Sequence, residues 1–187
     1  DAAKQVQQAH FDRFLKDKSL RGRCIKQENK KIAGARNAGI RCAEAELIAF
    51  LDHDDLWFPE KLAKVMAEFA AHPDADLVCH NENVVKNGEF VRLSRNGPWV
   101  ENMYERLLFE GNALSPSAVT VKKAKLFEAG LFRENPEFNT VEDYDLWMRL
   151  AKIARMRFLD EALGEYQLVE RGASNQIVYH NTNLEHL

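Results

Sequence analysis

The chain has 187 residues, of which 45% are hydrophobic, a length that suits one domain with a sizeable core and is short for two. A formal charge of -3 and the lack of a dense Lys/Arg block argue against general affinity for nucleic acid. No apolar run is long enough to span a bilayer, and the polar start is unlike a secretory signal sequence. We therefore expect a single folding unit without a transmembrane segment.

The cysteines indicate a reducing compartment. Cys24, Cys42 and Cys79 are odd in number and widely spaced, and no Cys-x-x-Cys pair occurs. Neither a disulfide framework nor a thiolate zinc site is indicated. We expect a cytoplasmic location, with peripheral association at the inner face of the membrane left open.

The first quarter of the chain predicts two helices and two strands. A helical stripe of apolar residues covers 1–20, and Gly22 ends it. A short strand is expected at 23–27 and a second helix at 30–43. Residues 47–51 are continuously apolar and end abruptly in acids, as in a strand buried on both faces of a largely parallel sheet.

Pro59 suits the first position of a third helix, which we expect to run to about His72. The spacing of its apolar residues predicts a core stripe. The stripe consists of Leu62, Val65, Met66 and Phe69.

The rest of the chain continues the alternation of strands and helices. After a strand at 76–80, the Asn87-Gly88 pair predicts a hairpin over 84–93. Helices are expected at 101–110, 124–129 and 141–154, and strands at 118–121, 157–159 and 165–169. This order predicts an α/β fold with a mostly parallel central sheet flanked by helices. The weak pattern from about 174 indicates a disordered tail.

An acidic cluster follows the strand at 47–51. Asp52, Asp54 and Asp55 place three carboxylates within four residues, and their repulsion calls for a cation. Oxygen ligands suit Mg²⁺ or Mn²⁺, and Mg²⁺ is usually held by one or two carboxylates while substrate phosphates complete its shell. The leading interpretation is a metal bound together with a diphosphate.

The acidic cluster has two other interpretations, an EF-hand loop and a helix cap. An EF-hand loop counted from Asp52 has Trp57 in place of the turn glycine and Ala63 in place of the bidentate glutamate, so it is excluded. Simple capping of the next helix by Asp54 or Asp55 stays open for this segment taken alone.

Four segments in order carry a family resemblance. Residues 50–62, FLDHDDLWFPEKL, resemble the Asp-x-Asp region of family 2 glycosyltransferases, the inverting family with the nucleotide-sugar-binding GT-A fold. Residues 29–40, with the core GARNAGI, are similar to the helix before that region. Residues 141–150, VEDYDLWMRL, resemble the Glu-Asp catalytic segment, and residues 111–132 resemble the acceptor-side stretch. The resemblance implies a donor that is a nucleotide-diphosphate sugar and a saccharide or lipid-linked acceptor.

The resemblance also implies roles for the acidic cluster. Asp54 would bind Mn²⁺ or Mg²⁺, which neutralises the charge that grows on the leaving diphosphate. Asp52 would contact the donor ribose or the surroundings of the metal, and Asp55 would add polar support. His53 occupies the variable middle position, where we expect an outward or packing role.

A base must remove the proton of the attacking acceptor hydroxyl, and Asp143 is our choice for it. Glu142 beside it would join the donor site. Arg36 is the best candidate for a contact to the donor phosphate or base, because a guanidinium offers fixed donors to phosphate oxygens. Trp57 and Trp147 could line the sugar pocket, but large aromatics at such spacing are more often part of the core, so neither is counted among the catalytic residues.

The chain departs from the family pattern at both ends. The first strands and the loop that grips the nucleotide are not found ahead of the second helix, so we expect a single partial GT-A domain over 1–187. Residues 166–171 stand where many relatives carry a Tyr-Arg-x-His type segment, and Arg171 would hold the diphosphate there unless water completes the metal shell. The absence of a Gln-x-x-Arg-Trp pattern favours addition of a single sugar.

Two alternatives to a glycosyltransferase remain at this stage. The first is a non-catalytic or truncated protein of the same fold that binds a nucleotide sugar. The second is a phosphoryl- or nucleotidyl-transfer enzyme, which would need a glycine-rich phosphate loop that the sequence does not contain.

Overall fold

The computed structural model describes residues 12–13, 16–17, 21–97 and 101–168. Within them the helices are α2 (Lys31–Cys42), α3 (Lys61–Ala71), α4 (Met103–Glu110), α5 (Lys123–Glu128) and α6 (Glu142–Leu150), with 3₁₀ turns η1 (Pro116–Ala118) and η2 (Pro136–Phe138). The strands are β1 (Leu47–Ala49), β2 (Leu56–Trp57), β3 (Leu77–Lys86), β4 (Glu89–Ser94), β5 (Val119–Lys122) and β6 (Met156–Gln167).

These strands form one mixed sheet in the order β1-β5-β3-β6-β2, with β4 paired to β3. The α/β class is confirmed, with a correction to the expected mostly parallel sheet. Only β3 and β6 run parallel, and the other four pairings are antiparallel. The two-residue turn between β3 and β4 requires antiparallel strands, whereas the parallel pair β3 and β6 is joined by a long crossover through α4, α5 and α6.

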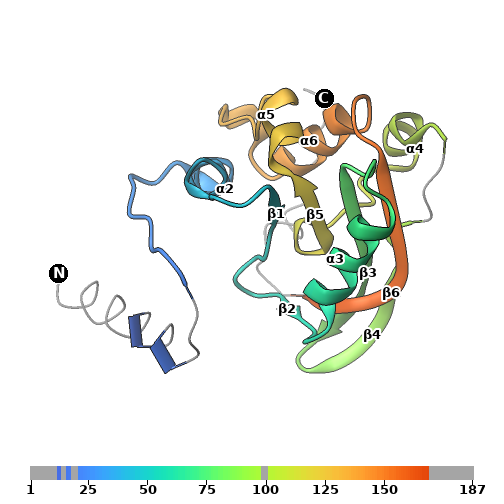
Figure 1. The fold of residues 1–187 in the computed structure, drawn as a ribbon, viewed down its shortest axis with the longest axis horizontal. Coiled ribbons are helices and arrows are strands. Elements are labelled where there is room, and N and C mark those ends of the chain that lie inside the picture. Colours follow the sequence, from blue (N-terminus) through green and yellow to red (C-terminus); the bar gives the residue numbers. More distant parts are fainter. Residues whose placement is uncertain (1–11, 14–15, 18–20, 98–100, 169–187) are drawn as a thin grey trace.

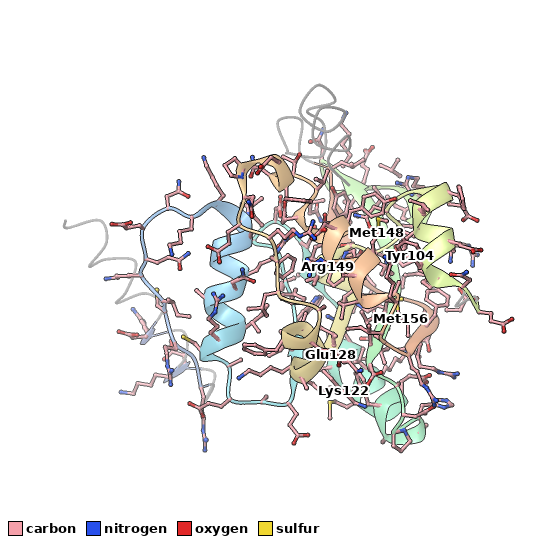
Figure 2. The ribbon with its side chains drawn as sticks, turned by 90° about the horizontal axis from the view of Figure 1, so that it is seen from above. Tyr104, Lys122, Glu128, Met148, Arg149 and Met156 are labelled. Carbon is pink, nitrogen blue, oxygen red and sulfur yellow. The ribbon has the colours of Figure 1, made fainter. Side chains whose placement is uncertain are left out.

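The two faces of the sheet carry different layers (Figure 1). On one face, Val65 and Phe69 of α3 pack on Val78 and Leu163. On the other face, a larger core joins the sheet to α2, α4, α5 and α6. In this layer Arg149 of α6, labelled in Figure 2, donates from Nη2 to the carbonyl oxygen of Leu131 at 2.8 Å and so fixes the loop after α5.

Most of the expected helices are present, and α3 differs in its orientation. It begins at Lys61 rather than at Pro59. Leu62 is 51% and Met66 54% exposed, so half of the expected core stripe is wrong. Lys61, Val65 and Phe69, which are spaced four apart, face the sheet instead.

The strands differ more from expectation than the helices. The expected strand at 23–27 is not formed, because this segment runs exposed and away from the sheet, with no strand beside it (Figure 1). β1 is shorter than expected and pairs only with β5 among the described strands, so it is not a fully buried central strand. β3 and β6 are each one continuous strand where shorter pieces were expected, and β2 was not anticipated.

The hairpin at Asn87-Gly88 is confirmed. Asn87 has φ 53° and Gly88 has φ 82°, the pair of positive angles that a tight turn between β3 and β4 requires. The helix expected over 1–20 lies mostly outside the described residues, as does the tail from 174. Of the three free cysteines, Cys79 is buried, whereas Cys24 and Cys42 are exposed.

Candidate active site

The acidic loop, defined here as Asp52–Asp55, lies between β1 and β2. It closes on itself through a hydrogen bond from the amide of Asp55 to the carbonyl of Asp52, 3.2 Å long. The chain then pairs with β6, where Leu56 lies opposite Glu165. A Cβ at Gly164 would meet the carbonyl oxygen of Leu56 at 2.6 Å, so this close approach requires glycine. The loop is therefore anchored to both edges of the sheet.

Arg36 joins the acidic loop to the start of α6. Its Nη1 donates to Oε1 of Glu142 at 2.8 Å, and its Nη2 lies 2.9 Å from both carboxylate oxygens of Asp52. The guanidinium is also 5.3 Å from the centroid of the Phe132 ring. One partly buried cation thus brings together the two acidic motifs that the sequence keeps far apart. Its role as a phosphate contact stays a prediction.

Asp55 is turned into the protein. One carboxylate oxygen accepts from Oγ of Ser117 at 2.6 Å, and the other accepts from the amide of Gln167 at 3.0 Å. Burial raises the pKa of Asp55, and these two hydrogen bonds oppose the rise. The same Ser117 Oγ accepts from the amide of Asp52 at 3.0 Å. Asp55 therefore fixes the end of the acidic loop to Ser117 of η1 and to Gln167 of β6.

Asp54 lies at the exposed tip of the loop. Its side chain is 38% exposed and that of His53 is 96% exposed, with His53 Nδ1 3.8 Å from a carboxylate oxygen of Asp54. Over the described residues no group of three His, Cys, Asp or Glu side chains is arranged to hold a metal. A cation at this loop would depend on one or two carboxylates and on its ligand.

Asp143 lies in the first turn of α6 beside Glu142. One of its carboxylate oxygens accepts from the amide of Tyr144 at 2.7 Å, and the other accepts from Nδ2 of Asn112 at 3.3 Å. Burial raises the pKa of Asp143, while Arg36 and these hydrogen bonds lower it. A carboxylate with a raised pKa that keeps a hydrogen-bonded orientation is suited to act as a base.

Sequence reasoning missed three polar residues at this site: Lys61, Asn112 and Ser117. Asn112 and Ser117 fall within the segment similar to the acceptor-side stretch, but the pattern does not say which of its side chains turn toward the acids. Lys61 gave no signal, because a lysine on an amphipathic helix is normally solvated.

The tryptophans have separate positions. Trp147 is fully buried, and its ring lies edge-on to Phe50 and Phe132 with centroids 6.3 and 6.2 Å away. Its assignment to the core is confirmed. Trp57 lies at the site, where its Nε1 donates to the carbonyl oxygen of Ser117 at 2.8 Å.

Arg171 lies outside the described residues. A cavity of about 600 Å³ opens at the other end of β1, lined by Leu47, Phe69, Lys122, Phe127 and their neighbours. Its lining includes neither the acidic loop nor Arg36, Glu142 or Asp143.

A mixed sheet with helices on both faces, and with two acidic motifs meeting at one end, defines an α/β domain with a carboxylate-rich site. The sequence profile described as "Glycosyl transferase family 2" matches residues 1–134. The chain therefore belongs to glycosyl transferase family 2, and the resemblance of its motifs to that family is confirmed.

Two curated relatives illustrate the similarity. An uncharacterized glycosyltransferase, alr2836, from a Nostoc species is 27% identical over 82% of this chain and 48% of its own length. The amylovoran biosynthesis glycosyltransferase AmsB of Erwinia amylovora is 26% identical over 76% of this chain and 48% of its own length. The chain thus spans about half the length of these relatives.

Among solved structures, residues 1–349 of TarS from S. aureus in complex with UDP-GlcNAc share the fold. The TM-score is 0.70 at 23% identity, over 90% of this chain and 48% of that one. Among the described residues, every helix is too short or too polar to cross a membrane.

Proposed function

We propose that the protein transfers a sugar from a nucleotide-diphosphate sugar to an acceptor hydroxyl with inversion. The observation that carries the proposal is the double ion pair of Arg36, which holds Asp52 and Glu142 together and brings Asp143 beside the acidic loop. Family membership supports glycosyl transfer, and the TarS complexes with UDP-GlcNAc and UDP support a nucleotide-sugar donor.

We assign the divalent cation, Mn²⁺ or Mg²⁺, to Asp54. Asp52 is engaged by Arg36, and Asp55 is engaged by Ser117 and Gln167. Asp54 is left at the exposed tip, facing solvent, with an oxygen donor of the kind these ions prefer. When bound, the cation would offset the charge of the leaving diphosphate.

Asp143 would take the proton from the acceptor hydroxyl. Asn112 and the amide of Tyr144 hold its carboxylate in one orientation, and its raised pKa increases its affinity for that proton. The base lies on α6, opposite a donor held at the acidic loop. Attack from the face away from the diphosphate gives inversion.

The remaining charged residues would bind the donor. Asp52 and Glu142 are placed by Arg36, and Arg171 is proposed as a further diphosphate contact. The acceptor would be a saccharide or a lipid-linked saccharide, and the amylovoran biosynthesis relatives support the first. A cytoplasmic location that includes the inner face of the membrane fits such acceptors.

The test is sugar transfer and donor hydrolysis by the purified protein with Mn²⁺, across UDP-, GDP- and dTDP-linked sugars. Asp143→Asn is expected to keep donor binding and to lose about 10²–10⁴-fold in rate. Glu137→Gln, at an exposed carboxylate on η2, is the matched control and should keep the full rate. Inactivity with every donor, or an unchanged rate in Asp143→Asn, would refute the proposal. Metal-dependent UDP binding without turnover would favour a non-catalytic binding protein.

A further inference from the structure

Lys61 is a fully buried cation at an unfavourable position. Its side chain is 0% exposed, and it is the first residue of α3. Burial removes an ammonium from water, and the positive end of a helix dipole repels it. An apolar residue would suit the helix face that also carries Val65 and Phe69. The placement of a lysine here calls for an explanation other than stability.

The ammonium of Lys61 contacts Ser117 of η1 and Trp57 of β2, the strand that follows the acidic loop. Its Nζ donates to the carbonyl oxygen of Ser117 at 3.2 Å and lies 3.4 Å from the centroid of the Trp57 ring. Trp57 Nε1 donates to the same carbonyl at 2.8 Å. Burial lowers the pKa of Lys61 to about 7, and the charge of the buried Glu82 carboxylate on β3 opposes this lowering. Lys61 therefore holds Ser117 and Trp57 in one arrangement.

Ser117 connects Lys61 and Trp57 to the acidic loop through hydrogen bonds. Its hydroxyl donates to Asp55 at 2.6 Å and accepts from the amide of Asp52 at 3.0 Å. The carbonyl and the hydroxyl of one residue thus connect the buried ammonium to both ends of the loop. Asp54, at the tip between those ends, is placed by the backbone that they fix.

We propose that Lys61 is a positioning residue that holds the acidic loop, through Ser117 and Trp57, in the arrangement that receives the cation and the donor diphosphate. This inference rests on the proposed function, because it concerns the same loop. Lys61 touches neither ligand. Its removal should change how well the loop binds, rather than whether the protein folds.

The test compares Lys61→Met with Lys64→Met. Methionine keeps the length of the side chain and removes the charge. Lys64, three residues along α3, is exposed and paired only to Glu161 among the described residues, so it controls for loss of a lysine from this helix. Mn²⁺ binding, UDP binding in the presence of Mn²⁺, Tm and amide hydrogen exchange over residues 51–58 are measured for each.

In Lys61→Met we expect about tenfold weaker binding of Mn²⁺ and of UDP, the loss usual for residues that orient metal ligands. The amides of the acidic loop should exchange faster, and Tm should not fall. Lys64→Met should bind as the unaltered protein does. A lower Tm with unchanged binding would show that Lys61 only supports the fold and would overturn the proposal.

Ser117→Ala gives a second, independent test. It keeps the carbonyl that Lys61 binds and removes the hydroxyl that holds the loop, so it should weaken binding to a similar extent. Because both residues act on one path, the losses should not add in Lys61→Met/Ser117→Ala. Full additivity would overturn the proposal. If Lys61→Met does not fold, Lys61→Met/Glu82→Gln removes the carboxyl left without its partner and carries the same expectation.

Binding of Mn²⁺ and UDP by the unaltered protein distinguishes failure of the proposed function from failure of the positioning role. If the unaltered protein binds UDP with Mn²⁺ while Lys61→Met binds equally well, the positioning role fails and the proposed function stands. If the unaltered protein binds neither Mn²⁺ nor UDP, the proposed function fails and the positioning role fails with it.

Discussion

Arg36 and Glu142 are 106 residues apart in the chain, and their side chains meet at 2.8 Å. The guanidinium is held at the same time by Asp52, so α2, the acidic loop and α6 converge on one cation. Glu142 is buried and Asp52 is partly exposed. The carboxylate of Glu142 on α6 therefore depends more on the positive charge of Arg36 than that of Asp52 does.

Replacing Arg36 by Met should therefore destabilise the protein and disturb the site. We expect the free energy of unfolding to fall by about 3 kcal/mol, since the change leaves the buried carboxylate of Glu142 without its partner. Urea unfolding measures this. Arg41→Met, on the same helix at an exposed position, should change stability by less than about 0.5 kcal/mol. Equal losses in the two variants would contradict the prediction.

Asn112 should affect the pH at which kcat/KM falls on the acid side of its pH profile. Its amide donates to the carboxylate of Asp143 and lowers the pKa of that group, which burial has raised. A base must be deprotonated, so activity should fall as the pH drops through this pKa. In Asn112→Ala the carboxylate loses a donor, its pKa rises, and the acid limb of kcat/KM should move to higher pH. A limb that stays in place or moves to lower pH would show that another group controls it.

Asp54 and Asp55 should separate metal binding from stability. Asp54→Ala should leave the free energy of unfolding nearly unchanged and remove most Mn²⁺ binding, because the side chain lies at the exposed tip. Asp55→Ala removes the acceptor of two hydrogen bonds and should cost about 1–3 kcal/mol. Titration with Mn²⁺ and urea unfolding on each variant check the pair. Chelation of the metal with EDTA should imitate Asp54→Ala.

Glu82 should make the protein less stable as the pH rises from about 5 to 7. Burial raises the pKa of Glu82 from 4.5 to about 7, so over this range the folded state keeps a proton that the unfolded state has lost. Stability falls with pH wherever the folded state binds more protons. Glu82→Gln removes this effect and should be more stable than the unaltered protein at pH 8, relative to pH 5, by on the order of 2 kcal/mol.

His80 is buried two residues before Glu82, and its effect on the pH dependence of stability has the opposite sign. Burial lowers its pKa from 6.5 to about 4, so the unfolded state binds the extra proton between these values. Its contribution therefore rises with pH and is the same in both proteins. Urea unfolding of the Glu82→Gln variant and the unaltered protein at each pH cancels it. Parallel pH profiles of the two proteins would contradict the role of Glu82.

Local pattern located the helices and the hairpin, because a helical stripe or an Asn-Gly turn needs only neighbouring residues. The sheet could not be read in the same way. β6 is one strand that pairs with both β3 and β2, and its register on β3 shifts near Asn81. Such pairings depend on distant partners. The face of α3 was misjudged because Lys61 is buried while Leu62 is exposed.

The site could be predicted in composition and only partly in arrangement. Asp52 and Glu142 were expected near one another from the family resemblance. That Arg36 holds both, and that Asp55 turns inward to Ser117, depends on side-chain directions that a motif does not specify.

The edge-to-face cluster of Phe50, Phe132 and Trp147 joins the segment before the acidic loop to α6. Phe50 precedes Asp52 by two residues, and Trp147 follows Asp143 by four. If the proposed function holds, we expect the sizes of these rings to influence the spacing between the acidic loop and Asp143. Since a misplacement of about 1 Å can cost about 10²-fold in rate, an exchange such as Phe50→Leu is expected to slow the reaction without altering a charged group.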